Sequence, residues 1–345
     1  MQAWQIGDGS ATPLDELPLT LPAGGFVWIA VERETLREQF PMLQARLAHW
    51  TGAPLLELHV SDLLNEQLPS NFDNTQAYDL MVLQRLGAVA GTGPVQLDTR
   101  AIGFAVYAHV LISVHPPACP VRAHFAERLT QWCTVPAGSF ATRLPSSPDE
   151  LMLRIANHVV DSYLALRREL GRQHGELQLA LINTRQPFTD WSTLLGARDT
   201  LQRLEDLCAD QQSAVQEWLD ALAEWPAGEG QAEREQLRVR GRDLLEHIER
   251  VLAHVRRLAV STESAVQMHY AALAHRTNNI MRVLTALTAV FLPLNLITGI
   301  FGMNFDALPL IHSATGFWIA FGAMVTIAAS LVWWFRRKRY LGTRP

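Results

Sequence analysis

The sequence has little cysteine and lacks the motifs of the common enzyme classes. Cys119, Cys133 and Cys208 are its only three cysteines in 345 residues, and they form no CxxC pair, so we expect reduced, buried thiols. We find no nucleotide-binding loop, catalytic triad, internal repeat or low-complexity tract, and therefore predict that the protein is not an enzyme. The first ten residues lack the basic and apolar regions of a signal peptide. A net charge of −5 argues against a nucleic-acid partner and is compatible with cations.

Charge is missing altogether from two stretches, residues 283–301 and 316–335. Each has roughly 20 residues, the length at which an α-helix crosses about 30 Å of hydrocarbon. A pair of buried helices in a large soluble core is the alternative, but uncharged runs flanked by arginine disfavour it. The sequence therefore predicts two transmembrane helices, 283–302 and 316–335, joined by a short outer loop, 303–315.

Basic residues predict the orientation of these helices in the lipid bilayer. Arg276 and Arg282 precede the first helix, and a basic cluster begins the tail formed by residues 336–345. The loop has no lysine or arginine. Because basic residues concentrate on the cytoplasmic side, both termini are expected to be cytoplasmic, in a bacterial-type inner membrane.

Residues 1–120 are predicted to form a cytosolic α/β domain, because strand-like apolar runs alternate with candidate helices. The candidate helices are 36–51 and 61–67, with Ser61 as the N-cap of the second. His115 ends the last strand and is expected to be structural, with metal binding as the lesser alternative. The candidate strands are 3–6, 26–31, 55–59, 80–86, 95–98, 102–106 and 110–114, the last two forming a hairpin.

Residues 121–232 are predicted to be helical, and residues 233–302 to form one long stalk helix that becomes the first transmembrane helix. Apolar residues recur at three- and four-residue spacing from Asp149 onward. After Glu233 there is no proline before Pro293, and a narrow apolar stripe with a spacing near 3.5 persists to the membrane. So long a helix with so narrow a stripe needs identical neighbours, which predicts a symmetric homo-oligomer.

Two helices cannot enclose a pore, so any transport across the membrane would need such an oligomer. Polar residues are frequent in the first transmembrane helix, so it is the better candidate for the pore lining. Polar rings and apolar collars alternate along one of its faces, and apolar collars can gate by dewetting. The alternative is that its threonine and asparagine groups bond only within or between helices. The predicted pore face consists of Asn278, Met281, Leu284, Thr288, Leu292, Asn295 and Gly299.

The same region carries a family resemblance. The chain has the strings TNNIMRVLT from Thr277, FLPL from Phe291 and GIFGMNF from Gly299. In a two-span protein this combination resembles the CorA family of divalent-cation channels, which includes magnesium channels and the zinc-transporting ZntB branch. The resemblance implies an α+β membrane protein that assembles as a homopentameric funnel. It also implies that the GMN motif, Gly302, Met303 and Asn304, forms the selectivity ring at the outer mouth.

Neutral polar rings suit Mg²⁺, because this ion holds its octahedral water shell tightly and is bound through oxygen atoms. His312 is the only candidate zinc ligand in the loop, so Mg²⁺ is the expected transported ion and Zn²⁺, carried by a ZntB-type transporter, is the alternative. No other cofactor is expected. Leu310 stands where many family members have glutamate, and Asp306 is the remaining acidic residue of the loop. This departure supports an alternative from another class, a non-conducting membrane scaffold or metal sensor.

Two cytosolic carboxylates complete the resemblance. Asp62 and Asp243 stand where magnesium-gated members of the family carry aspartates that share a regulatory Mg²⁺ between adjacent subunits. Such a pair would repel without a cation and attach with one. The alternative is that Asp62 only follows a helix cap and that Asp243 lies on a solvated helix face.

Overall fold

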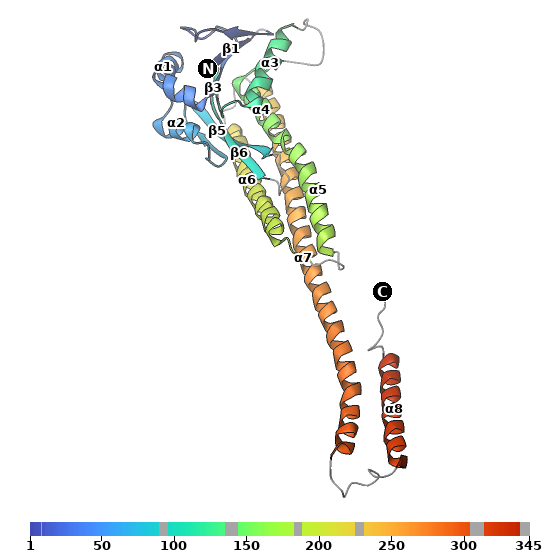
Figure 1. Cartoon of the computed structure of the whole chain (residues 1–345). Helices are drawn as coiled ribbons and strands as arrows, with labels where there is room; N and C mark the ends of the chain where they lie inside the picture. The colour runs from blue at the N-terminus through green and yellow to red at the C-terminus, as the bar shows by residue number, and fades with distance from the viewer. Residues whose placement is uncertain are drawn as a thin grey trace. The chain divides into compact units, whose positions relative to one another are not determined.

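The structure is a computed structural model that describes residues 1–7, 9–89, 96–134, 144–182, 188–224, 231–303 and 314–338. The chain divides into two compact units, Met1–Glu263 and Ser264–Pro345. The first unit contains a mixed sheet, helices α1 to α6 and the first part of α7, and the second unit contains the rest of α7 and α8 (Figure 1).

A seven-stranded sheet forms the centre of the first unit, with the strand order β2-β1-β3-β7-β6-β5-β4. Its neighbours are antiparallel except β3 and β7, which are parallel. These two strands are buried on both faces, and their near-continuous apolar sequences are typical of strands covered by helices on both sides. The strands are β1 (Gln2–Gly7), β2 (Ser10–Leu14), β3 (Phe26–Glu32), β4 (Asn71–Asn74), β5 (Tyr78–Val89), β6 (Gln96–Tyr107) and β7 (Val110–His115).

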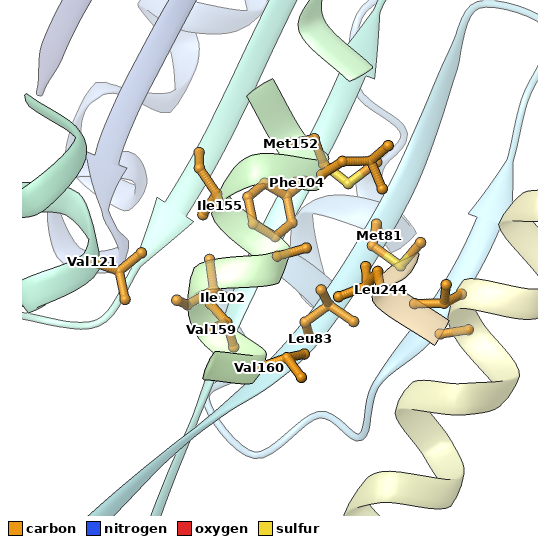
Figure 2. Packing of buried hydrophobic residues seen from close by; sticks show 14 of the residues in the cluster. Met81, Leu83, Ile102, Phe104, Val121, Met152, Ile155, Val159, Val160 and Leu244 are labelled. Carbon is orange, nitrogen blue, oxygen red and sulfur yellow. The ribbon is translucent and has the colours of Figure 1, made fainter. Parts of the chain in front are cut away.

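Helices cover both faces of the sheet. Successive side chains of a strand point to opposite faces, and in β3 both sets are apolar and need to be buried. Val27, Ile29 and Val31 of β3 belong to a core that they share with α1 and α2, whereas Trp28 and Ala30 belong to the core that contains residues of α3 to α7. Figure 2 shows part of the core that contains Trp28 and Ala30, where side chains of β5 and β6 meet those of α4. The helices are α1 (Arg33–Thr51), α2 (Glu57–Leu64), α3 (Pro120–Thr134), α4 (Pro148–Asp161), α5 (Tyr163–Ile182), α6 (Trp191–Glu224), α7 (Gln231–Phe301) and α8 (Ala314–Arg337).

The long helix and most of the central strands are confirmed, and three local predictions are wrong. Residues 55–59 do not form a strand, because α2 begins at Glu57 and buries His59, Val60 and Leu63 on one helical face. Ser61 therefore lies inside α2 and is not its cap. The predicted strands 95–98 and 102–106 join into the single strand β6. We missed β2 and β4, edge strands whose mostly polar or exposed residues give no apolar alternation.

Two of the three cysteines are free, buried thiols, as predicted. Cys119 and Cys208 are free and almost completely buried. The side chain of Cys133 lies outside the described residues. His115 is fully buried, and its Nε2 lies 2.8 Å from the hydroxyl of Ser113, as expected for a structural histidine.

Candidate ion-conducting site

The second unit exposes large apolar side chains along two helices that are long enough to cross a membrane. Only 6 % of the most apolar segment is buried in either α7 or α8. Leu292 of α7 is 69 % exposed, and Trp318 of α8 is 68 % exposed. A core helix of a soluble protein would bury such residues. These helices therefore need lipid or other helices around them.

Burial along the membrane half of α7 follows one stripe. Ala286 is buried, and Val290, Pro293 and Ile297 are half-buried at helical spacing. Thr288 and Leu292 each lie two residues beyond a member of this stripe, which corresponds to roughly 200° around an α-helix. The predicted pore face is thus opposite the covered stripe. All of its members are exposed: Asn278, Met281, Leu284, Thr288, Leu292, Asn295 and Gly299.

Threonine hydroxyls of the span donate hydrogen bonds to their own helix. Thr285 Oγ1 donates to the carbonyl of Met281 at 2.7 Å, and Thr288 Oγ1 donates to that of Leu284 at 2.9 Å. Thr298 Oγ1 donates to the carbonyl of Asn295 at 3.1 Å. The protons of these three hydroxyls are therefore used in hydrogen bonds to carbonyls of the same helix, as the alternative interpretation of the threonines predicts. Each hydroxyl oxygen still has acceptor capacity toward water, because a hydroxyl has one proton and two lone pairs.

The end of α7 is tightened at the first residues of the GMN motif. The Gly302 amide donates to the carbonyl of Thr298 at 2.9 Å, and the Met303 amide donates to that of Ile300 at 3.3 Å. A Cβ at Gly302 would lie 3.0 Å from the Thr298 oxygen, so glycine permits this close approach. Asn304, Asp306, Leu310 and His312 lie outside the described residues.

In the first unit, Asp62 lies on α2 and Asp243 lies on α7. No hydrogen bond or ion pair joins the two among the described residues. Asp243 Oδ1 is 3.8 Å from His247 Nε2, and the Nδ1 of the same ring is 3.8 Å from Asp161 Oδ1. These three side chains form a row rather than a cage. No group of three His, Cys, Asp or Glu in the described part of the chain could hold a metal ion.

Known proteins share this arrangement, in which two exposed apolar helices follow a long stalk. The CorA-like Mg²⁺ transporter protein family matches residues 23–337. The chain belongs to this family.

Two curated relatives are similar over different lengths. The cobalt/magnesium transport protein CorA of Thermotoga maritima is 29 % identical over 100 residues, which are 29 % of this chain and 28 % of the relative. The putative metal ion transporter YfjQ of Bacillus subtilis is 24 % identical over 281 residues, which are 81 % of each chain. The match therefore spans less than a third of the first relative.

One solved structure matches the whole architecture. The CorA magnesium transporter of Methanocaldococcus jannaschii has a TM-score of 0.71 at 20 % identity, over 97 % of both chains. At this identity the likeness establishes the fold: an N-terminal α/β domain, a long helix and two candidate membrane helices.

Two features of this CorA-like chain were not predicted from the sequence. His247 lies four residues after Asp243, a spacing that puts both on one helix face, but Asp161 comes from another helix. Asp149 is almost completely buried at the start of α4. Burial, followed by the negative charges of Asp79 and Glu233, raises the pKa of Asp149 to about 7, and burial raises the pKa of Asp79 to about 6.

Proposed function

We propose that this chain forms a homopentameric channel or transporter of the CorA type that moves Mg²⁺ across the inner membrane. The observation that carries the proposal is the exposed face of α7, on which polar and apolar residues alternate opposite the stripe covered within the chain. A polar face left open in a transmembrane helix needs water or a neighbouring helix. A symmetric ring of copies supplies both. The number five rests on the family resemblance.

The proposed pore conducts a hydrated ion. Mg²⁺ dehydrates reluctantly, so neutral oxygens that meet its water shell are better suited than a tight cage of charged ligands. Thr288 and Asn295 provide such oxygens within the span, and Asn304 provides an amide ring at the outer mouth. Leu284 and Leu292 form apolar collars between these rings, where dewetting closes the pore. The ion gradient and the membrane potential supply the driving force.

We further propose the topology that the basic residues predict, with both termini in the cytoplasm. Arg336, Arg337 and Lys338 follow the apolar part of α8, and all three are exposed. Arg337 lies 5.3 Å from the centre of the Trp333 ring, an arrangement typical of side chains at the lipid–water boundary.

Regulation by the transported ion is part of the same proposal. Asp62 and Asp243 of adjacent subunits would share a Mg²⁺ that holds the subunits together at high ion concentration. Neither carboxylate is paired with the other inside one chain, and the Asp243 side chain is 55 % exposed. His247 and Asp161 lie next to Asp243 and would add to the polar environment of the ion.

The test is ion flux into liposomes that contain the purified full-length chain, under an inside-negative potential and with a Mg²⁺-sensitive dye inside. We expect uptake of Mg²⁺ that empty liposomes lack. A parallel series with Zn²⁺ and a zinc dye tests the alternative substrate. Absence of flux for both ions, in vesicles that contain assembled oligomers, would support the non-conducting scaffold or sensor instead.

A matched pair of variants tests the pore face itself. Leu292→Ala removes a proposed collar, and Leu287→Ala makes the same change at another exposed leucine, roughly 100° around α7 from Thr288. We expect Leu292→Ala to raise the basal Mg²⁺ flux several-fold and Leu287→Ala to leave it unchanged. Equal fluxes in the two variants would show that this face of α7 does not line the pore.

A further inference from the structure

A buried histidine joins α5 to the long helix α7 near the end of the first unit. His174 of α5 is 9 % exposed, and its Nδ1 lies 3.0 Å from the hydroxyl oxygen of Thr262 on α7. One turn further along α5, Gln178 Nε2 donates to Ser261 Oγ at 2.5 Å. The first unit ends at Glu263, directly after Thr262. These two polar contacts therefore hold α5 against α7 immediately before α7 enters the second unit.

The other nitrogen of the His174 ring has no hydrogen-bond partner in the part of the chain that the structure describes. This Nε2 atom is buried. The ring lines a cavity of about 20 Å³ between α5 and α6, which has room for about one water molecule and for no hydrated ion. The other lining residues are Leu170, Gln173, Ala197, Thr200 and Leu201.

A neutral ring suits this environment better than a protonated one. The Thr262 hydroxyl can donate or accept, so its contact with Nδ1 is compatible with either neutral tautomer. In the protonated ring both nitrogens are donors, and the N–H at the buried Nε2 is then left with at most one water as its acceptor. Protonation would also place a charge among largely apolar side chains, which costs free energy unless the charge is paired.

The charges around the contact between α5 and α7 also oppose protonation. Burial lowers the pKa of His174. His254 of α7 likewise has a buried Nε2 without a partner, and burial, followed by the positive charges of Arg167, Arg257 and His174, lowers its pKa. A proton on one ring therefore disfavours a proton on the other. No described carboxylate forms an ion pair with either ring. Several neighbouring charges form ion pairs of their own: Arg172 with Glu169 and Glu176, Arg203 with Asp199, Arg198 with Glu263, and Arg256 with Glu205.

We propose that His174, Gln178, Ser261 and Thr262 form an acid-sensitive latch, the His174 latch, in which a proton taken up by His174 releases this part of α5 from α7. A histidine in water has a pKa of about 6.5, and the buried ring binds its proton more weakly. The closed latch is therefore fully stable above about pH 6.5 and loses stability as the pH falls below that value, because the open form then binds more protons. Between pH 7.5 and pH 5.5, one such histidine favours opening by up to about tenfold.

The His174 latch acts on the helix that continues into the second unit. α7 runs from Gln231 to Phe301 as one helix, and Thr262 lies within it. When the latch opens, α7 loses the side-chain contacts that α5 makes with Ser261 and Thr262. Acidification on the side of the first unit would thus loosen the support of the same helix that carries the proposed pore face. The latch does not depend on the proposed transport, because its four residues all lie in the first unit.

Hydrogen–deuterium exchange of the full-length protein in detergent, followed by mass spectrometry, tests the latch in the unaltered chain. Exchange is measured at pH 7.5 and pH 5.5 and divided by the intrinsic rate at each pH, so that only opening of the structure is compared. Residues 170–182 of α5 should lose protection by up to about tenfold at pH 5.5, whereas α1 in the same sample should not. Unchanged protection in α5, or an equal loss in α5 and α1, would overturn the proposal.

A matched pair of variants assigns the effect to one ring. His174→Asn keeps an amide where Nδ1 meets Thr262 but cannot take up a proton, so it should remove the loss of protection at pH 5.5. His49→Asn makes the same change at an exposed histidine of α1 and should keep the loss. If His174→Asn loses protection in α5 as the wild type does, another group is responsible and the His174 latch is refuted. If His174→Asn does not fold at pH 7.5, the comparison of α5 with α1 in the wild type decides.

Discussion

The contact between α6 and the stalk part of α7 depends on a glycine, and substituting it has a predictable effect on stability. A Cβ added to Gly241 would lie 2.7 Å from Trp218 Cζ3 and 2.7 Å from Leu219 Cδ2. Trp218 is almost completely buried and cannot move away freely. Overpacking of this kind costs about 1–3 kcal/mol, and the better helix propensity of alanine returns up to about 1 kcal/mol. With that gain subtracted, we expect Gly241→Ala to destabilise the first unit by up to about 2 kcal/mol.

Gly171→Ala in α5 is the matched control, since a Cβ there meets nothing within 4 Å. It should stabilise the protein by up to about 1 kcal/mol, and because the propensity gain is common to both variants, they should differ by the overpacking cost, about 1–3 kcal/mol. Thermal unfolding of the full-length protein in one detergent, followed by tryptophan fluorescence, measures this difference. If Gly241→Ala unfolds at the same temperature as Gly171→Ala, α6 and α7 do not approach each other as closely as the structure has them.

The remaining predictions concern topology, assembly, the outer mouth and pH. A cysteine at Ala314, in a background without native cysteines, should react with an impermeant thiol reagent from outside; reaction only in broken membranes would reverse the orientation. Native mass measurement should give a pentamer, and a monomer or dimer would defeat the pore. Asn304→Ala should lower Mg²⁺ uptake at least roughly tenfold through lost amide oxygens, whereas Leu310→Glu should raise the apparent affinity for cations; wild-type uptake by Asn304→Ala pentamers would contradict the GMN assignment. Because the pKa of buried Asp149 is raised to about 7, its contribution to stability is full below the unfolded pKa and is lost as the pH rises through about 7. Asp149→Asn should thus raise the free energy of unfolding more at about pH 8 than at about pH 5, by at most about 1.4 kcal/mol per unit of pKa shift, as measured by thermal unfolding; a pH-independent difference would show that this carboxyl is not perturbed.

The sequence alone determined the elements whose pattern is carried by many residues. The apolar period that runs without proline from Glu233 to Pro293 predicted α7. The absence of charge in 283–301 and 316–335 predicted two transmembrane helices, and the structure has two exposed apolar helices of sufficient length there. The apolar runs of β3 and β7 predicted central strands. These signals are strong because hydrophobic burial is roughly proportional to area and acts over whole helices and strands. The predictions of short helices and strands were less secure. Residues 55–59 fit both a strand and a helix, and only packing against β6 and α1 makes them part of α2.

The tertiary structure decided which side chains from distant parts of the sequence meet. The sequence identified Asp243, but its neighbour Asp161 comes from α4, and no spacing in the sequence predicts that contact. Trp28 and Ser113 are separated by most of the α/β region, and the parallel pairing of β3 with β7 lets the Trp28 indole donate to Ser113 Oγ at 2.8 Å. Hydrogen bonding there depends on individual atoms a few ångströms apart. A periodic pattern fixes which face of an element is buried, whereas the partner of a single polar atom is fixed only when the elements have packed.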